Sequence, residues 1–276
     1  MNVDCLNRTK SFKKRLQRGA GNSRLFAFLL FGSLLWVSPV FAEEKNSCVL
    51  CHMDAKFLVQ NKKLYDYYKN WTRSGHYRNG VKCQDCHGGF PEKSEKEEAH
   101  GVTAVMDASN PKSAVNFRNI PGTCKKCHEE IFSAYKQSNH YAEFKDAGSG
   151  PNCVTCHGSL NAEILNANTV KATCIQCHNA KSGNSPEIPE KAELALNKYL
   201  ANRRLFHWVV KHSTETGAKD VLLRVNAHER GLVLKWHTFD LNGFEKDVEK
   251  LIVDLKAERA KYVKNGDEAS SQRDGP

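Results

Sequence analysis

The chain has 276 residues, of which 26% are charged, and a mean hydropathy of -0.59, which excludes a protein with many membrane-spanning segments. Its formal net charge of +10 is concentrated near the start. Residues 1–42 hold seven Lys/Arg and one Asp, which leaves 34 basic and 30 acidic residues in the remainder. A surplus of four charges, without interleaved basic and aromatic residues, argues against a nucleic-acid-binding protein.

The first 42 residues have the pattern of an export signal. Basic residues between Lys13 and Arg24 precede an apolar run at Leu25–Val37, and Val40-Phe41-Ala42 offers a small-residue cleavage site. We expect cleavage after Ala42. The alternative is an uncleaved anchor, because residues 25–42 reach the lower limit of length for a spanning helix. Either reading places the rest of the chain in the periplasm of a Gram-negative bacterium, free or held at the outer face of the inner membrane.

Cysteine is the most informative residue type, because ten of the eleven cysteines form five copies of Cys-x-x-Cys-His. This pattern is the attachment sequence of c-type haem. Cysteines three residues apart share a helix face and can bond the two vinyl groups of one porphyrin, while the histidine can bind its iron. The motif residues are Cys48, Cys51 and His52; Cys83, Cys86 and His87; Cys124, Cys127 and His128; Cys153, Cys156 and His157; Cys174, Cys177 and His178. We therefore predict five covalently bound haem c groups, each with its iron; no role is predicted for Cys5.

Two other chemistries use paired cysteines. Zinc sites combine such pairs with histidines further along the chain, and redox enzymes use a single Cys-x-x-Cys. Neither requires a histidine directly after each of five pairs, and a plain disulfide scaffold does not require one either. The export signal supports haem independently, because haem is attached outside the cytoplasm.

An internal repeat divides the motif region, residues 43–185, into two modules with two motifs each, followed by a fifth motif. Residues 71–77 (Trp-Thr-Arg-Ser-Gly-His-Tyr) match residues 135–141 (Tyr-Lys-Gln-Ser-Asn-His-Tyr) at the aromatic, Ser, His and final Tyr positions. Each segment lies between the two motifs of its module. Because the repeat preserves His76 and His140 with their neighbours, we predict that they are distal ligands of equivalent haems.

The C-terminal region has a different character. Two polar stretches with prolines, 91–122 and 179–190, are expected to be mostly loop. Beyond them, Lys191–His212 and Phe244–Val263 have helical apolar spacing, and no stretch shows strand alternation. We expect a helical region at 186–264 and a disordered polar tail at 265–276. The predicted fold is mainly α with extensive irregular loops and little or no β, a multihaem cytochrome c fold organised around packed haems.

Seven histidines lie outside the motifs, enough to give every one of five irons a second histidine. The predicted distal ligands are His76, His140, His100, His207, His237 and His228. His207 is the preferred C-terminal source because it falls on the apolar side of the expected 191–212 helix, whereas His212 falls on the other side and is expected to face solvent. Methionine is scarce: beyond the start residue there are only Met53, expected to pack against porphyrin, and Met106.

The motif region resembles known multihaem c-type cytochromes. Residues 129–140 (Glu-Glu-Ile-Phe-Ser-Ala-Tyr-Lys-Gln-Ser-Asn-His) resemble a segment of the tetrahaem cytochrome of ammonia oxidisers and of hydroxylamine oxidoreductase-like proteins. There the histidine matching His140 is typically a distal ligand. Residues 74–87 resemble the membrane-anchored quinol-dehydrogenase cytochromes, which usually bind four haems. This chain has five motifs, and Met53 is one position too early for that group's Cys-x-x-Cys-His-x-Met.

These observations predict a periplasmic electron carrier rather than an enzyme, because an iron with two histidine ligands has no position left for substrate. Its expected partners are other redox proteins: cytochromes, reductases or quinol-oxidising complexes. Two alternatives remain open. One is a multihaem reductase or oxidase of a small nitrogen or sulfur compound at a five-coordinate haem, and the other is a membrane-anchored cytochrome that oxidises quinol. No catalytic residue is predicted, and membrane contact is expected only if the N-terminal segment is retained.

Overall fold

A computed structural model of the protein describes residues 46–101, 107–159 and 166–271, with side chains up to residue 263. The predicted export signal or anchor, Cys5 and Met106 lie outside these residues. All regular structure in the described part is helical, in fourteen helices without a strand, which confirms the predicted fold class. From Asn46 onward the chain forms one structural unit. Among the described helices none combines the length and the apolar character that crossing a membrane requires.

The described part of the motif region contains eleven short helices, none longer than the 12 residues of α3. They are α1 (Ser47–His52), α2 (Ala55–Gln60), α3 (Lys62–Arg73), α4 (Gly75–Arg78), α5 (Cys83–His87), α6 (Lys96–His100), α7 (Ile120–Lys125), α8 (Glu129–Tyr135), α9 (Asn139–Asp146), α10 (Cys153–His157) and α11 (Ala167–Ile175). Helices this short are marginal by themselves in water, so they depend on caps and on packing. The stretch 91–122, which was expected to be mostly loop, contains α6 and the start of α7.

The motif region has almost no side-chain core of its own. In residues 46–101 and 107–159 the buried apolar side chains, apart from Pro121, are Ala134, Tyr135 and Phe144. The other thirteen of the sixteen buried apolar residues of the described chain lie at residue 167 or beyond. A region of this length needs buried apolar surface to fold. The five porphyrins expected from the motifs would supply it.

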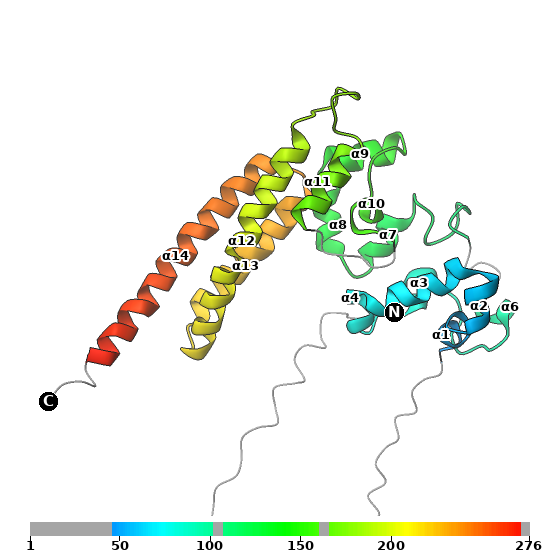
Figure 1. The fold of residues 1–276 in the computed structure, drawn as a ribbon, viewed down its shortest axis with the longest axis horizontal. Helices are drawn as coiled ribbons and strands as arrows, with labels where there is room; N and C mark the ends of the chain where they lie inside the picture. Colours follow the sequence, from blue (N-terminus) through cyan, green and yellow to red (C-terminus); the bar gives the residue numbers. More distant parts are fainter. Residues whose placement is uncertain (1–45, 102–106, 160–165, 272–276) are drawn as a thin grey trace, which may run out of the picture. The chain divides into compact units, whose positions relative to one another are not determined.

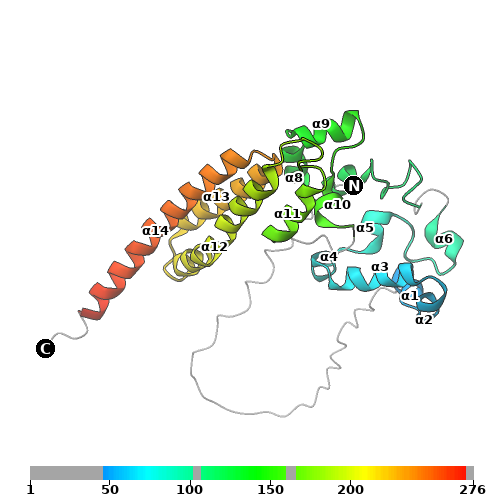
Figure 2. The ribbon, with the colours of Figure 1, turned by 45° about the horizontal axis from the view of Figure 1, so that its top comes forward.

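The C-terminal region is a bundle of three long helices: α12 (Ile188–Glu215), α13 (Lys219–His237) and α14 (Leu241–Ser271). Figures 1 and 2 show the three helices lying side by side, joined by short turns. Their core contains Val209, Leu232, Phe244, Val248 and Leu255, each with at most 2% of its surface exposed.

Two features of the bundle differ from the expectation. α13 lies within the region expected to be helical, but it was not identified as a separate helix, unlike Lys191–His212 and Phe244–Val263. α14 continues to Ser271, so the expected disordered tail begins too early at residue 265. The polar residues 264–271 include Lys, Glu and Ala, which favour helix, and no proline stops them.

The bundle is joined to the motif region rather than separate from it. α12 packs along α11, the helix that carries Cys174, through a second cluster of Ala167, Val170, Ala192 and Leu196. α13 packs against α8, where the guanidinium of Arg230 forms an ion pair with Glu130. The C-terminal helices are therefore in position to contribute side chains to haem sites.

Candidate haem sites

The second motif of each module forms a short helix with matching ends. α5 and α10 both run from the first motif cysteine to the motif histidine. At the start of each helix a side chain three residues on accepts a hydrogen bond from the N-cap backbone: Asp85 Oδ2 from Lys82 N at 2.7 Å, and Thr155 Oγ1 from Asn152 N at 3.0 Å. Each helix ends at a glycine of positive φ, Gly88 or Gly158, a conformation that other residues adopt with strain. The cysteine pair is thus held on one helical turn.

The cysteines of consecutive motifs lie close to one another. Burial raises the pKa of Cys83 to about 11, and the neighbouring thiol of Cys48 adds to the effect. Burial likewise raises the pKa of Cys86, with Cys124 as the next cause. The first motif is therefore a neighbour of the second, and the second of the third.

The same relation continues through the remaining motifs. A hydrogen bond between the thiols of Cys124 and Cys153 raises the pKa of Cys124. Burial raises the pKa of Cys156 to about 11, and the thiol of Cys174 contributes. The cysteines of each motif thus lie near those of the next motif along the chain.

Four of the five motif histidines lie near a histidine from outside the motifs. The distances between ring centroids are 6.4 Å for His52 and His100, 6.1 Å for His128 and His76, 6.1 Å for His157 and His237, and 6.0 Å for His178 and His140. An imidazole nitrogen binds a metal at about 2.0–2.1 Å and lies about 1 Å from its ring centre, so two rings that share one iron have centres about 6 Å apart. The spacing of all four pairs fits a shared haem iron.

Hydrogen bonds orient two of these rings for metal binding. Nδ1 of His237 donates to the main-chain oxygen of Val233 at 2.7 Å, and Nδ1 of His178 donates to that of Asn184 at 2.9 Å. A carbonyl oxygen only accepts, so the proton is on Nδ1 and the lone pair of Nε2 is free for iron. Burial also lowers the pKa of His237, which favours the neutral imidazole that ligates metals.

His140 has a different environment. Its Nδ1 is buried and has no hydrogen-bond partner within the described residues, while its ring contacts Phe239 edge-on at 4.2 Å. Burial lowers the pKa of this histidine as well. An unpartnered buried ring nitrogen is unusual and fits a ring held by a metal rather than by hydrogen bonds. Phe239 was not predicted as part of a site, since no motif or repeat marks it.

The repeated histidines do not pair with motifs of their own module. His76 belongs to the first module but lies beside His128, in the first motif of the second module. His140 belongs to the second module but lies beside His178, in the fifth motif. Each of these histidines therefore reaches forward to a motif beyond its own module, and the modules are interlocked.

His87 differs from the other motif histidines. Burial lowers its pKa, and the histidine that adds to this effect is His52 of the first motif. Within the residues that the structure describes, no histidine from outside the motifs has its ring beside that of His87. Met53, which follows His52, is 46% exposed. The ligand environment of the second motif is thus distinct from the four histidine pairs.

Three C-terminal histidines lie elsewhere than expected. His207 is exposed and contacts Phe206, although its position was predicted to be on the buried side of the helix. The reason is that the buried side of α12 rotates along its length. Leu196, the reference for the prediction, packs on α11, whereas the half that contains His207 packs through Val209 on α13 and α14.

The other two histidines belong to contacts within the bundle. His228 Nε2 lies 3.2 Å from the main-chain oxygen of Asp247, so this ring joins α13 to α14. His212 was expected to face solvent but is half-buried, because its ring stacks on Trp208 at 3.7 Å. Neither ring is paired with a motif histidine among the described residues.

Some of the exposed apolar side chains lie within or next to the motifs. Leu50 lies within the first motif and is 53% exposed, and Ile175 lies within the fifth and is 43% exposed. Phe90, three residues after His87, is also exposed. Apolar side chains beside covalent attachment points are suited to contact with a flat apolar porphyrin. The residues present therefore fit haem at the motifs.

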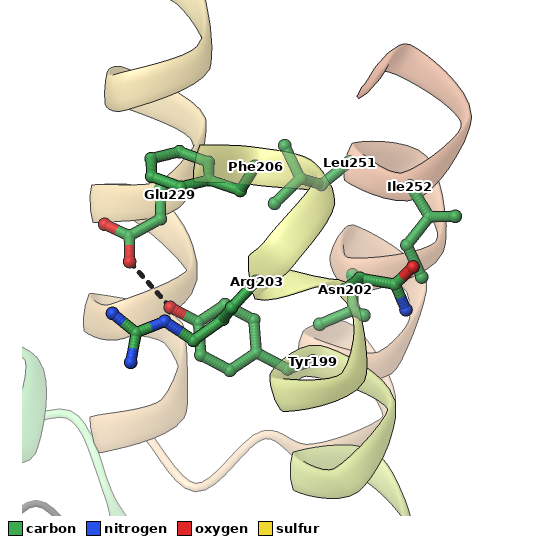
Figure 3. A pocket seen from close by; sticks show the side chains of 8 residues that line it. Tyr199, Asn202, Arg203, Phe206, Glu229, Leu251 and Ile252 are labelled. Carbon is green, nitrogen blue, oxygen red and sulfur yellow. Dashed lines mark hydrogen bonds between the residues drawn. The ribbon is translucent and has the colours of Figure 1, made fainter. Parts of the chain in front are cut away.

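A small pocket lies away from the motifs, within the C-terminal bundle. Figure 3 shows Tyr199 and Glu229 at one side of it, where the tyrosine hydroxyl donates to the carboxylate at 2.6 Å. Its lining includes Phe206, Leu251 and Ile252, and neither a cysteine nor a histidine. This pocket is a feature of helix packing and not a haem site.

Comparisons with known proteins agree with the haem interpretation. A family model described as cytochrome c7 and related cytochrome c matches residues 108–179, which contain the third, fourth and fifth motifs. The chain is also similar to the multiheme cytochrome MtrA of Shewanella baltica (strain OS185), with 26% identity over 162 residues. That match covers 58% of this chain and 39% of the relative, so the chain spans about two fifths of the relative's length.

No solved structure matches the chain significantly. The similarity to known cytochromes coincides with the Cys-x-x-Cys-His repeats, and the structure adds histidine pairs at the spacing of a shared iron. Together these findings support a multihaem c-type cytochrome.

Proposed function

We propose that the protein carries five haems and passes electrons along them in the order of their motifs. The observation that carries this proposal is the set of four motif histidines whose rings lie 6.0–6.4 Å from the ring of another histidine. The neighbouring attachment cysteines support the order. When bound, haem c supplies a one-electron iron couple at each site. The residues of the chain attach, ligate and space these groups.

The histidine pairs support a carrier rather than an enzyme. We propose that His52 and His100, His76 and His128, His157 and His237, and His140 and His178 each hold one iron from two sides. Two histidines leave no free coordination position, and paired histidines keep the haem potential lower than a His/Met pair does. Four such sites suit electron transfer at low potential.

The environment of His87 supports a second candidate function, that of a reductase or oxidase. His87 has no distal histidine beside it within the described residues, so the haem of Cys83 and Cys86 is the one place where a small molecule could reach iron. This would be the site of the reductase or oxidase activity on a small nitrogen or sulfur compound. Binding of carbon monoxide to the reduced protein tests it, because only an accessible iron binds this ligand.

We further propose that the protein works in the periplasm. The N-terminal pattern of residues 1–42 and the attachment chemistry of haem c both support export. Its partners would be other redox proteins, which donate electrons at one end of the motif series and accept them at the other. N-terminal sequencing of the mature protein distinguishes a free carrier from the membrane-anchored quinol-oxidising alternative.

Two measurements on the exported protein test the proposed carrier function. Mass spectrometry should show the mass of five haems added to the mature chain, and film voltammetry should show five electrons taken up per chain. Fewer than five haems, or haems that do not exchange electrons with one another, would contradict the proposal.

A further inference from the structure

The repeated segments 71–77 and 135–141 contain more than a histidine. We propose that each segment is a positioning element that fixes the distal histidine of one haem and the attachment motif of the neighbouring haem in a single rigid unit. This inference rests on the proposed histidine ligation. It assigns roles to the aromatic, serine and tyrosine positions of the repeat, which ligation alone does not explain.

The serine of each repeat caps the helix that carries the distal histidine. Ser138 is 5% exposed; its Oγ donates to the main-chain oxygen of Tyr135 at 2.7 Å and accepts from the backbone nitrogen of Tyr141 at 3.1 Å. Ser74 is 2% exposed and makes the equivalent two bonds, at 2.7 and 3.1 Å. Both histidines occupy the second position of their helix, so the cap sets the direction of the imidazole.

The aromatic residue at the start of each repeat ties the segment to the next motif. The hydroxyl of Tyr135 donates to the main-chain oxygen of Pro151 at 2.6 Å, two residues before Cys153. The indole N–H of Trp71 donates to the main-chain oxygen of Val81 at 3.2 Å, two residues before Cys83. Two chemically different donors thus reach the same backbone position, which indicates that the connection itself is what the repeat maintains.

The last tyrosine of the repeat packs on this aromatic residue. The rings of Trp71 and Tyr77 meet edge-to-face with centroids 4.8 Å apart, and those of Tyr135 and Tyr141 do so at 5.2 Å. Such contacts stabilise aromatic pairs beyond simple burial. Every position that the two segments share therefore has the same structural role in both modules.

The two ends of each unit serve different haems. In the second module the histidine end lies at His178, in the fifth motif, and the aromatic end holds the approach to the fourth motif. Cys156 and Cys174 of these two motifs are also neighbours. The unit therefore couples the ligand geometry of one haem to the spacing between that haem and the previous one.

The test uses Ser138→Ala and Tyr135→Phe in the exported, haem-loaded chain. Electron paramagnetic resonance first identifies the signal of the haem at His178 as the one lost in His140→Ala. We expect Ser138→Ala to shift or broaden that same signal and to move its midpoint potential, with five haems still attached. We expect Tyr135→Phe to do the same to a smaller extent, and Ser74→Ala to affect the haem at His128 instead.

Matched controls separate positioning from general loosening. Ser133→Ala removes an exposed serine hydroxyl from the same region, and Tyr141→Phe removes a hydroxyl but keeps the packed ring. Both should leave the signal unchanged. Ser138→Thr, which keeps a capping hydroxyl, should restore it, and this rescue decides the matter if the alanine variant is poorly exported.

Two outcomes would overturn different parts of the account. If Ser138→Ala and Tyr135→Phe resemble their controls while His140→Ala produces a high-spin haem, the positioning role is wrong and the ligation stands. If His140→Ala itself leaves all spectra unchanged, the proposed ligation is wrong and the positioning role falls with it.

Discussion

Replacing His237 by alanine should open one haem iron in the protein. The His237 ring is stacked 6.1 Å from that of His157, and the bond from its Nδ1 to the Val233 oxygen directs Nε2 away from its own helix. Because this ring is the proposed distal partner of His157, its loss removes one of two axial ligands from one iron. The substitution should therefore change the ligation of one haem and leave the other four unchanged.

The fold should tolerate this change. Position 237 is the last residue of α13, where alanine favours helix by up to about 0.7 kcal/mol over other ordinary residues. The carbonyl of Val233 loses the hydrogen bond from the imidazole but can still accept one from the backbone N–H of residue 237, as in any α-helix. The core residues Leu232 and Phe244 are untouched and remain almost fully buried.

Carbon monoxide titration of the reduced variant measures the opened site. We expect one additional carbon monoxide bound per chain relative to the unaltered protein, together with one additional high-spin haem in the oxidised state. His207→Ala is the matched control, because His207 lies on the same bundle but is exposed and pairs with no motif histidine in the described residues. If His237→Ala behaves like His207→Ala, the assignment of His237 to the fourth motif is refuted.

Three further predictions concern folding and attachment. Leu232→Ala should destabilise the three-helix bundle by about 2–5 kcal/mol, since Leu232 is 1% exposed, while Leu223→Ala, at a 74% exposed position of the same helix, should change the free energy of unfolding little; thermal unfolding compares the two. Gly150→Ala should disturb the approach to the fourth motif and change the haem spectrum, because a Cβ there would lie 2.4 Å from the main-chain oxygen of His140. Gly183→Ala, where φ is positive but no atom lies within 4 Å, introduces backbone strain without crowding, so its haem spectrum separates the two effects. Replacing Cys174 and Cys177 together by alanine should lower the mass by one haem and leave four, whereas an unchanged haem count would exclude the fifth motif as an attachment site.

The sequence predicted what depends on local pattern. Attachment needs two thiols and a histidine within one helical turn, so Cys153, Cys156 and His157 could be recognised without a structure. The repeat likewise marked His76 and His140 for a shared role. The long bundle helices were predicted in part, because Phe244, Val248 and Leu251 recur at helical spacing.

The pairing of histidines could not be predicted in this way, because it depends on contacts far along the chain. Nothing near His76 indicates that it lies beside His128 in the next module. His207 was preferred to His237 because α12 was assumed to bury the same side along its whole length. The helix instead packs on α11 near Leu196 and on α13 and α14 near Val209, so His207 is exposed. The role of Phe239 beside His140 arises from the turn between α13 and α14, whose position the sequence pattern did not indicate.

Near-infrared magnetic circular dichroism of the fully oxidised, exported protein tests the central claim most directly, because its charge-transfer bands distinguish iron with two histidine ligands from iron with histidine and methionine. The account predicts five haems per chain, of which at least four show the bis-histidine band. A chain with fewer than four such haems, or with a histidine–methionine band accounting for more than one haem, would contradict it.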